Sequence, residues 1–510
     1  MLVFRSVRFF SSLVSFHDQS AANKQEKFDQ IRSRFSNSAS TDPNAPHRPI
    51  DLTPAPISDL SFRTGVPPHQ RAILNLVTGA IGIATLLQPV LSAIVLSSAL
   101  FLVFSLLVTW RLFLVLVGVF ARCLGHADKI DVPDVTGLPV FTILIAAYHE
   151  AALMDQLAKA LHGLNWPDEN TQILLLLESH DEATIEAAQR ANFPISTTIL
   201  QVPPGGPRTK PNALNFGLRR ARGDYVGIFD VEDAPHPDQL LAAFNAFDHA
   251  PAEVVCVQAP LRADNGDASW IAAQWALDYD VQFSLLIPGL SVYRMPILLG
   301  GTSNYIRRDA LLALGAWDAW NVTEDADLGM RLARANLRTA SIATPTFETA
   351  PGTLPVWLAQ RTRWLKGFLQ TWLVLMRQPG QTLRQMGLVP FLVMQLTLGG
   401  ALIAPLANAP SVLLAAIAFF SGQMAIGAFG LALLIAGLSV CFIGDILAPG
   451  RWSAQRMTAI LTRPFYWPLH SLAAYRAVSE LAIRPFFWAK TPHHPRDVEK
   501  VSFYSTGSSA

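Results

Sequence analysis

The chain has 510 residues, of which 51% are hydrophobic and 15% are charged, and its formal net charge at pH 7 is +1. Soluble domains carry roughly 25% charged residues, so we expect part of this chain to lie in lipid. A net charge near zero argues against a protein that binds nucleic acid electrostatically. The three scattered cysteines, Cys123, Cys256 and Cys441, form neither a disulfide framework nor a zinc motif.

Residues 1–70 are predicted to form a tail and a linker. Residues 1–16 are basic and apolar, and for them a weakly ordered tail is favoured over a membrane-surface helix. Residues 35–68 are rich in Ser, Pro, Asn and Asp, a composition typical of linkers.

Residues 71–120 are predicted to hold two transmembrane helices. Between positions 72 and 120 the only charged side chain is that of Arg111. One crossing takes about 20 apolar residues, so this stretch is long enough for two. Gln88-Pro89 is the natural position for the turn between them.

Residues 133–355 are predicted to form one α/β domain, because short apolar runs alternate with helical patterns. Successive β-α-β units imply a mostly parallel sheet, whose ligands bind beyond the carboxyl ends of the strands. We expect strands at 139–146, 171–177, 196–202 and 224–229, and helices at 151–164, 183–190, 213–222 and 326–335.

Acidic clusters follow three of the predicted strands. Glu150 comes after the first strand, Glu178 after the second, and Asp230 and Glu232 after the fourth. A single cluster of this kind is usually turn chemistry. Three clusters at strand ends instead favour one ligand-binding crevice.

Asp230 and Glu232 form a candidate metal site. In an extended tip, residues two apart point the same way, so both carboxylates could hold one Mg²⁺ or Mn²⁺. Lys210, in a glycine-containing loop upstream, is a plausible partner for phosphate. Most such loops are solvated turns, so the loop by itself is weak evidence.

Thr323-Glu324-Asp325 precedes the helix predicted at 326–335. Thr323 is expected to cap this helix, and the helix dipole favours carboxylates in its first turn. Helix stability alone would therefore explain these residues. The functional alternative is that the dipole keeps Asp325 ionised, so that it can accept a proton.

Residues 356–380 are predicted to form an interfacial helix. Within it, Gln360, Arg363 and Trp364 fall on one face. An amide, a guanidinium and an indole suit a diphosphate and a sugar ring. The alternative is that Trp and Arg anchor the helix at the lipid headgroups.

Residues 385–447 are predicted to be transmembrane, in two long or three short crossings, because no charged side chain lies between Arg384 and Asp445. Pro405, Asn408 and Pro410 are expected to mark the first turn or a break. Residues 448–510 are predicted to be an interfacial or membrane segment with a tail, and the pattern leaves open whether 457–488 cross the bilayer once more.

In chain order the sequence reads YHE, ESHD, RTKPNALN, DVED, GGTSN, TED and QRTRW. From about Pro139 to Phe368 this set resembles the membrane-bound family 2 glycosyltransferases of the cellulose, chitin and hyaluronan synthase type. The resemblance implies a GT-A fold, a UDP-sugar donor, a divalent metal and inverting transfer at the cytoplasmic face.

The resemblance also implies roles for individual side chains. Asp325 would be the catalytic base, and Asp230 and Glu232 would hold the metal. Trp364 and Glu324 would bind the acceptor. The donor would be bound by Glu150, Glu178, Lys210, Asp230, Gln360 and Arg363.

The chain departs from the family pattern at several positions. Glu178 stands where Asp is usual, the metal motif reads D-x-E rather than D-x-D, and His149 replaces a common Asn. Residues 485–493 resemble the W-x-K-T-x-H ending of some bacterial members. This segment is either a flap that returns to the active site or a plain interfacial tail.

These observations predict an integral protein of the bacterial inner membrane with a cytoplasmic catalytic domain. The favoured function is a polysaccharide synthase that uses a UDP-sugar, Mg²⁺ or Mn²⁺ and a polysaccharide acceptor. The runner-up is a transferase that adds one sugar to a lipid such as ceramide or diacylglycerol. A non-catalytic scaffold or transporter is disfavoured, because all the acidic positions are occupied. Membrane lipid is an expected partner and nucleic acid is not.

Overall fold

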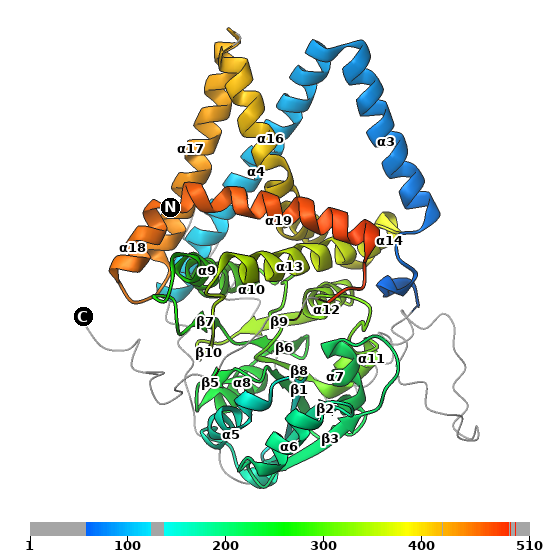
Figure 1. The fold of residues 1–510 in the computed structure, drawn as a ribbon, viewed down its shortest axis with the longest axis vertical. Helices are drawn as coiled ribbons and strands as arrows, with labels where there is room; N and C mark the ends of the chain where they lie inside the picture. The colour runs from blue at the N-terminus through cyan, green and yellow to red at the C-terminus, as the bar shows by residue number, and fades with distance from the viewer. Residues whose placement is uncertain (1–57, 124–136, 421, 489, 491–494, 496–510) are drawn as a thin grey trace.

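A computed structural model describes residues 58–123, 137–420, 422–488, 490 and 495. The expectations for residues 1–57 and for most of the 485–493 segment beyond Trp488 lie outside the described residues. In Figure 1 the α/β part lies below, long apolar helices extend above, and a layer of helices lies between them.

The α/β part is built on a seven-stranded sheet of order β3-β2-β1-β4-β8-β6-β9. Its first four strands are parallel, and β8 is antiparallel to both of its neighbours. All four predicted strands are present, and the sheet is mostly parallel as expected. The strands are β1 (Phe141–Ala147), β2 (Thr171–Glu178), β3 (Thr197–Val202), β4 (Tyr225–Phe229), β6 (Val254–Gln258), β8 (Asn304–Arg307) and β9 (Arg338–Ser341).

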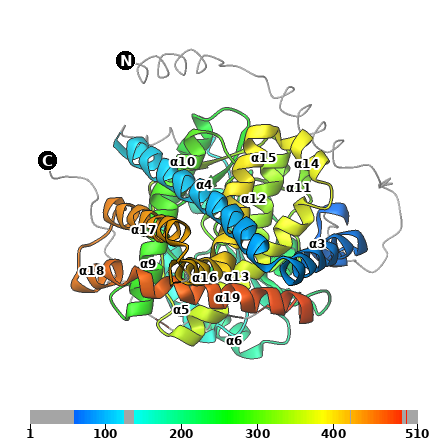
Figure 2. The ribbon, with the colours of Figure 1, turned by 90° about the horizontal axis from the view of Figure 1, so that it is seen from above.

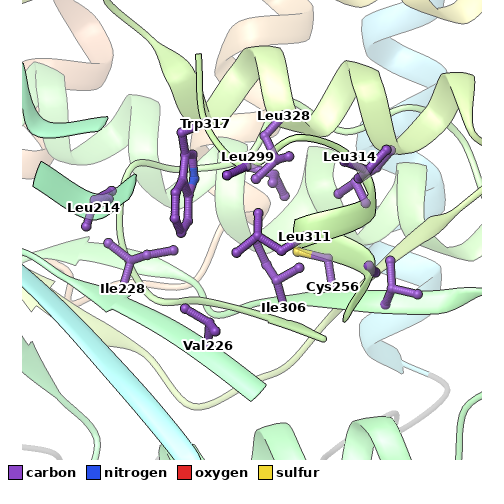
Figure 3. Packing of buried hydrophobic residues seen from close by; sticks show 14 of the residues in the cluster. Leu214, Val226, Ile228, Cys256, Leu299, Ile306, Leu311, Leu314, Trp317 and Leu328 are labelled. Atoms are coloured by element: carbon purple, nitrogen blue, oxygen red, sulfur yellow. The ribbon is translucent and has the colours of Figure 1, made fainter. Parts of the chain in front are cut away.

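Apolar side chains pack on both faces of this sheet, because successive residues of a strand point to opposite faces. Leu144 of β1 belongs to the cluster on one face, and Ile143 and Ile145 belong to the cluster on the other. Figure 3 shows part of the first cluster, in which Val226 and Ile306 of the sheet lie below Trp317 and Leu328. The helices of this part are α5 (Met154–His162), α6 (Glu182–Arg190), α7 (Lys210–Leu218), α8 (Gln239–Asp248), α11 (Arg308–Ala313) and α12 (Glu324–Arg334).

The helix predicted at 213–222 is α7, which begins three residues earlier and ends earlier than expected. Pro211 stands in its first turn, where the fixed φ of proline favours helix initiation and its missing N–H costs nothing. This early start brings Lys210 into the first turn of the helix.

A layer of helices lies between the sheet and the apolar helices. A small sheet of β5 (Ala234–Pro235), β10 (Thr346–Glu348) and β7 (Leu261–Ala263) borders it. In Figure 1, α13 and α19 run across the molecule at this level, and Leu365 of α13 packs against Ala473, Ala474 and Ala477 of α19. The layer contains α9 (Trp270–Val281), η5 (Gln282–Leu286), α10 (Ile287–Val292), α13 (Leu354–Leu375), α14 (Pro379–Met386), α18 (Ala454–Leu461) and α19 (Arg463–Ile483).

Four segments among the described residues are long and apolar enough to cross a membrane. Seen from above in Figure 2, α4 crosses the molecule diagonally beside α16 and α17. The segments are α3 (Pro68–Leu87), α4 (Pro89–Cys123), the continuous stretch Leu388–Phe420 and α17 (Met424–Leu447). The stretch Leu388–Phe420 consists of α15 (Leu388–Met394), η6 (Gln395–Gly399) and α16 (Gly400–Phe420).

The turn predicted at Gln88-Pro89 is confirmed, because α3 ends at Leu87 and α4 begins at Pro89. The turn or break predicted near Pro405 and Pro410 is wrong, because both prolines lie inside α16. Apolar helices that pack against other helices tolerate proline, because neighbouring groups and local adjustments satisfy the backbone atoms that it leaves unpaired. For residues 457–488, the position of α19 against α13 favours the interfacial alternative over a further crossing.

Buried ion pairs join the apolar helices to the rest of the molecule. Asp445 of α17 is fully buried and accepts hydrogen bonds from Nε and Nη2 of Arg463 in α19, both at 2.7 Å. Arg463 Nη1 also donates to Asp278 of α9 at 2.9 Å, and Arg361 of α13 donates to the second oxygen of Asp278 at 3.0 Å. Four helices are therefore held together by one network of carboxylates and guanidinium groups.

We expect Asp445→Ala to lower the free energy of unfolding in detergent by about 3–5 kcal/mol, because it leaves the buried Arg463 without a main partner. Replacing both partners, Asp445→Ala with Arg463→Met, should recover part of the loss, since no charge then stays buried alone. The control is Asp155→Ala at an exposed position of α5, with an effect within about 0.5 kcal/mol. A loss for Asp445→Ala no larger than the control would contradict the network's structural role.

Candidate active site

All ten side chains singled out from the sequence line one cavity of about 880 Å³ at the carboxyl ends of the strands. The convergence expected for the acidic clusters is therefore present, while the role of each residue stays a prediction. The ten are Glu150, Glu178, Lys210, Asp230, Glu232, Glu324, Asp325, Gln360, Arg363 and Trp364.

The end of the cavity deepest in the sheet domain holds Glu150 and Glu178. The backbone of the YHE loop is held by Asp181, which accepts a hydrogen bond from the His149 N–H at 2.5 Å. His149 has a φ of 55°, so this loop is turned tightly. Burial raises the pKa of Glu178, although His180 and Arg208 partly oppose this effect.

The segment near the C-terminus returns to this end of the cavity. Lys490 Nζ lies 2.8 Å from Glu150 Oε1 and donates a hydrogen bond to the carbonyl of His149 at 3.0 Å. Trp488 also lines the cavity, with Arg363 5.7 Å from the centre of its ring. The contacts of Trp488 and Lys490 favour the flap over the plain interfacial tail.

Lys210 occupies the first turn of α7 and reaches into the cavity. Its Nζ donates to Asp230 and to the carbonyl of Gly301, the latter at 2.7 Å. Burial alone would lower the pKa of Lys210, but the nearby carboxylates of Asp230 and Glu324 outweigh it and raise the pKa. The ammonium group is therefore charged, and it lies among oxygen atoms.

Residues 230–233 form a turn rather than the expected extended tip, because the Asp233 N–H donates to the carbonyl of Asp230 at 3.2 Å. Asp233 stabilises this turn by accepting from the Asp230 N–H at 2.7 Å and from the hydroxyl of Thr302. Burial, together with Asp230, raises the pKa of Asp233 to about 7. Asp233 thus supports the turn, and Asp230 and Glu232 line the cavity despite the different backbone.

The oxygen atoms here suit a hard divalent cation. Asp230 already holds one cation, the Lys210 ammonium, and Glu232 lines the same cavity. The described residues contain no group of three His, Cys, Asp or Glu side chains that could hold a metal by themselves. Mg²⁺ is commonly bound by one or two carboxylates with substrate phosphates and water, so two carboxylates fit such an ion when a phosphate is present.

Glu324 and Asp325 are the first two residues of α12. The prediction that Thr323 caps this helix is wrong. The Thr323 side chain makes no capping hydrogen bond, and Asp325 Oδ1 instead accepts from the Ala326 N–H at 2.8 Å. The role of the helix dipole in keeping Asp325 ionised stays a prediction, and burial raises the pKa of Asp325 despite that hydrogen bond and nearby Lys210 and Arg363. Burial and Asp325 likewise raise the pKa of Glu324.

The face of α13 that was predicted to bind ligand does point into the cavity. Arg363 Nη1 donates to the carbonyl of Val322 at 3.2 Å, just before the two carboxylates of α12. Gln360 accepts from the indole N–H of Trp275 at 2.9 Å. The ring of Trp364 stacks on Tyr279 at 6.0 Å, with Arg361 4.7 Å from its centre. Trp364 is thus held inside the protein, which argues against the membrane-anchor alternative.

Among the cavity residues that were missed from the sequence are Asp278, Tyr279 and Arg361. Trp275 and Tyr279 stand four apart in α9, and their rings stack at 3.6 Å. That spacing could have identified the aromatic face of the helix. The same pattern is typical of a buried core helix, so it does not by itself indicate a ligand site.

The cavity has a second, apolar arm that runs between α4, α16 and α17. Leu107 and Val108 of α4 face Gly400 and Gly437, where a Cβ would come within 2.6 Å of Leu107 and 3.6 Å of Val108. The arm is lined mainly by aliphatic and small residues, among them Leu107, Val108, Ala404, Pro405, Val412, Gly430, Leu434 and Gly437.

Residues 139–367 match the model of the family described as "Glycosyltransferase like family 2". A beta-monoglucosyldiacylglycerol synthase of Synechocystis sp. is 27% identical over 302 residues, which cover 57% of this chain and 59% of that protein. The UDP-forming cellulose synthase catalytic subunit of Komagataeibacter sucrofermentans is 24% identical over 254 residues, covering 48% of this chain and 33% of that protein.

A mannosyltransferase from Pyrobaculum calidifontis, solved in complex with GDP-Man and Mn²⁺, matches with a TM-score of 0.50 and 19% identity. The match covers 75% of this chain and 99% of that one. This likeness supports the GT-A-like fold. The chain spans about half the length of the first curated relatives it matches.

Proposed function

We propose that this chain, whose residues 139–367 match the model "Glycosyltransferase like family 2", transfers one sugar from a UDP-sugar donor to a membrane lipid. The observation that carries the proposal is a single cavity that runs from the carboxylates at the strand ends to an apolar arm between membrane helices. Donor and acceptor can therefore meet without the acceptor leaving the bilayer.

The lining of the apolar arm favours a lipid over a growing polysaccharide. A sugar chain in a protein channel needs hydrogen-bonding side chains along its path, because burying unpaired hydroxyl groups is costly. Aliphatic side chains such as Leu107, Val412 and Leu434 offer none and suit an acyl chain. The sequence alone favoured the polymer, and the chemistry of this arm reverses that preference.

The donor is assigned to the polar end of the cavity. The cations Lys210 and Arg363 suit its diphosphate, and Glu178, together with Glu150 beside Lys490, would hydrogen-bond to the nucleoside. Mg²⁺ or Mn²⁺ at Asp230 and Glu232 would neutralise part of the diphosphate charge when bound. The choice of a UDP-sugar rather than a GDP-sugar as the donor rests on the family resemblance.

Asp325 is the proposed base. The acceptor hydroxyl loses its proton to this carboxylate as its oxygen attacks the anomeric carbon. The bond between that carbon and the diphosphate oxygen then breaks, with inversion, and the electron pair leaves with the nucleotide. Lys210 and Arg363 stabilise the charge on the leaving group. The raised pKa of Asp325 makes it a stronger base than an exposed aspartate.

The catalytic domain is proposed to face the cytoplasm of a bacterial cell, where UDP-sugars are found. With two crossings in α3 and α4, the residues before α3 lie on the same side as this domain. Arg377, Arg384 and Arg451 near helix ends agree with cytoplasmic loops.

We expect Asp325→Asn to lower transfer by roughly 10²–10⁴-fold while leaving UDP affinity within about twofold, because it removes the base and no donor contact. The control is Asp309→Asn at the start of α11. Asp309 makes the same hydrogen bond to the next backbone N–H, at 2.8 Å, but does not line the cavity. Equal losses of transfer and UDP binding would contradict the assignment.

The rate should also fall as the pH falls through the raised pKa of Asp325, because the protonated carboxyl cannot accept a proton. The half-maximal rate should therefore lie above pH 4, the ordinary range of an aspartate. Initial rates at saturating donor across the acidic range measure this midpoint. A midpoint at or below pH 4 would show that a different group limits the rate.

Asp230→Ala should remove the dependence of UDP binding on Mg²⁺ or Mn²⁺, because it takes away one of two carboxylate ligands. Calorimetric titration of UDP with and without each metal gives the comparison. If metal strengthens UDP binding equally in the variant and the parent, the metal site lies elsewhere.

The decisive experiment uses the purified chain in nanodiscs with a panel of radiolabelled UDP-sugars and Mg²⁺ or Mn²⁺. Products are divided between chloroform-soluble lipid and insoluble polymer. Label in the lipid fraction supports the proposal, whereas label in polymer overturns it in favour of a polysaccharide synthase. Absence of turnover with every donor would refute a UDP-sugar transferase.

A further inference from the structure

Arg111 is a charged residue in the middle of an apolar helix. It is the only charged residue between positions 72 and 120 of the sequence, and it lies inside α4, which is apolar enough to cross a membrane. An ionisable side chain at such a position is costly and usually faces a functional cavity rather than lipid. Arg111 indeed lines the cavity described above.

The packing of α4 explains this orientation. Gly118, two turns further along α4, lies so close to η5 that a Cβ there would come within 2.2 Å of the Leu285 carbonyl oxygen. Residues seven apart share a helix face, so Arg111 is on the side of α4 that faces the protein interior. Between them, Leu114 and Val115 are buried against that interior.

The neighbouring cations already have carboxylate partners. Arg361 and Arg463 both pair with Asp278, and Arg463 pairs with Asp445 as well. Arg111 makes no ion pair within 4.0 Å and no side-chain hydrogen bond to any other residue that the structure describes, and its Nε is buried. His470 is not an anionic partner for Arg111. Burial lowers the pKa of His470 to about 3, so its ring is neutral at physiological pH.

We propose that Arg111 binds a phosphate group of the acceptor lipid, an inference that rests on the proposed function. The acceptor is then an anionic glycerophospholipid with a free hydroxyl in its headgroup, rather than a neutral diacylglycerol. A guanidinium group is well matched to a phosphate diester, which can accept two parallel hydrogen bonds. An anion here also supplies a direct partner for a partly buried guanidinium group that interacts with Asp278 only beyond ion-pair distance.

The order of groups along the cavity fits such a molecule. Acyl chains occupy the apolar arm between α4, α16 and α17, the phosphate lies at Arg111, and the headgroup extends towards Trp364 and Asp325. The headgroup hydroxyl oxygen forms the bond to the anomeric carbon, and its proton goes to Asp325. The bond from that carbon to the diphosphate breaks, and the nucleotide takes the electron pair.

The test compares phosphatidylglycerol with diacylglycerol as acceptors, using the full chain in phosphatidylcholine nanodiscs. Arg111→Gln should raise the KM for phosphatidylglycerol by about tenfold or more, leave the KM for the donor unchanged and leave UDP affinity unchanged. Arg111→Lys should keep part of the effect, because it retains the charge but not the planar fork. Equal use of both lipids, together with no effect of Arg111→Gln, would overturn the inference while leaving the lipid transferase intact.

Arg122→Gln is the matched control. Arg122 lies three turns along the same helix, is exposed and donates to the carbonyl of Leu447 at 3.0 Å, outside the cavity. It should not alter the acceptor KM. A rise equal to that of Arg111→Gln would instead indicate general attraction of the membrane surface for anionic lipid and would overturn the site.

Lipid binding gives a readout that does not depend on turnover. Native mass spectrometry of the detergent-solubilised chain should show phosphatidylglycerol retained by the parent and by Arg122→Gln, and lost from Arg111→Gln. Phosphatidylglycerol that is retained by the parent and lost from Arg111→Gln would support the binding site. This holds even if the transfer assay produced only polymer, a result that would refute the lipid transferase but not the site. Retention by all three proteins would overturn the site.

Two further measurements distinguish a lipid phosphate site from a soluble-anion site and from a purely structural role of Arg111. Inorganic phosphate, titrated without added lipid, should bind the parent and Arg111→Gln equally weakly. If the parent binds phosphate more tightly than Arg111→Gln does, the site belongs to a soluble anion. The Tm of Arg111→Gln should be unchanged, because the substitution removes no ion pair or side-chain hydrogen bond with another residue that the structure describes. A large fall in Tm would show that Arg111 has a structural role instead.

Discussion

The structure depends on charges buried where the apolar helices meet the rest of the molecule. Asp278 is the centre of this arrangement, because it accepts hydrogen bonds from Arg361 and Arg463 on two different helices. Burial alone would raise the pKa of Asp278, but these two cations outweigh it and hold the pKa at about 2. The carboxylate therefore stays ionised. Because an unpaired buried charge is costly, α9, α13, α17 and α19 are constrained to positions in which every partner is in place.

This constraint also shapes the cavity. The same α9 and α13 that carry the ion pairs carry Tyr279 and Trp364, whose rings stack within the cavity. Fixing the two helices against α17 and α19 thus fixes an aromatic surface between the carboxylates of α12 and the apolar arm. The result is a gradient of polarity along one cavity, from acidic side chains in the sheet domain to aliphatic side chains among the long apolar helices.

The gradient has chemical consequences for the groups in its middle. Asp325 and Arg363 are both partly buried, and this burial raises the pKa of the acid and lowers that of the guanidinium group. Each shift is limited by the other group's charge. A carboxylate that is ionised yet ready to accept a proton needs this balance, which an exposed helix terminus does not provide.

Much of this could be predicted from local patterns. Apolar runs such as Phe141–Ala147 predicted buried parallel strands, and acidic residues after them predicted a crevice at the strand ends, because both follow from the geometry of a single strand. The predictions that failed concerned positions where neighbouring segments decide the outcome. Pro405 and Pro410 lie within a helix, and Asp230 and Glu232 lie on a turn that Asp233 and Thr302 hold.

Composition and local patterns alone predict the class of the protein. The composition predicts membrane helices, the strand and helix periods predict an α/β domain, and the acidic and QRTRW motifs predict the chemistry of the site. What the site opens onto depends on tertiary packing, because the apolar arm forms where α4 lies against α16 and α17, about three hundred residues further along the chain. Arg111, Asp278 and Arg361 are all visible in the sequence. Whether each is paired or faces a cavity depends on long-range packing, which no local period encodes.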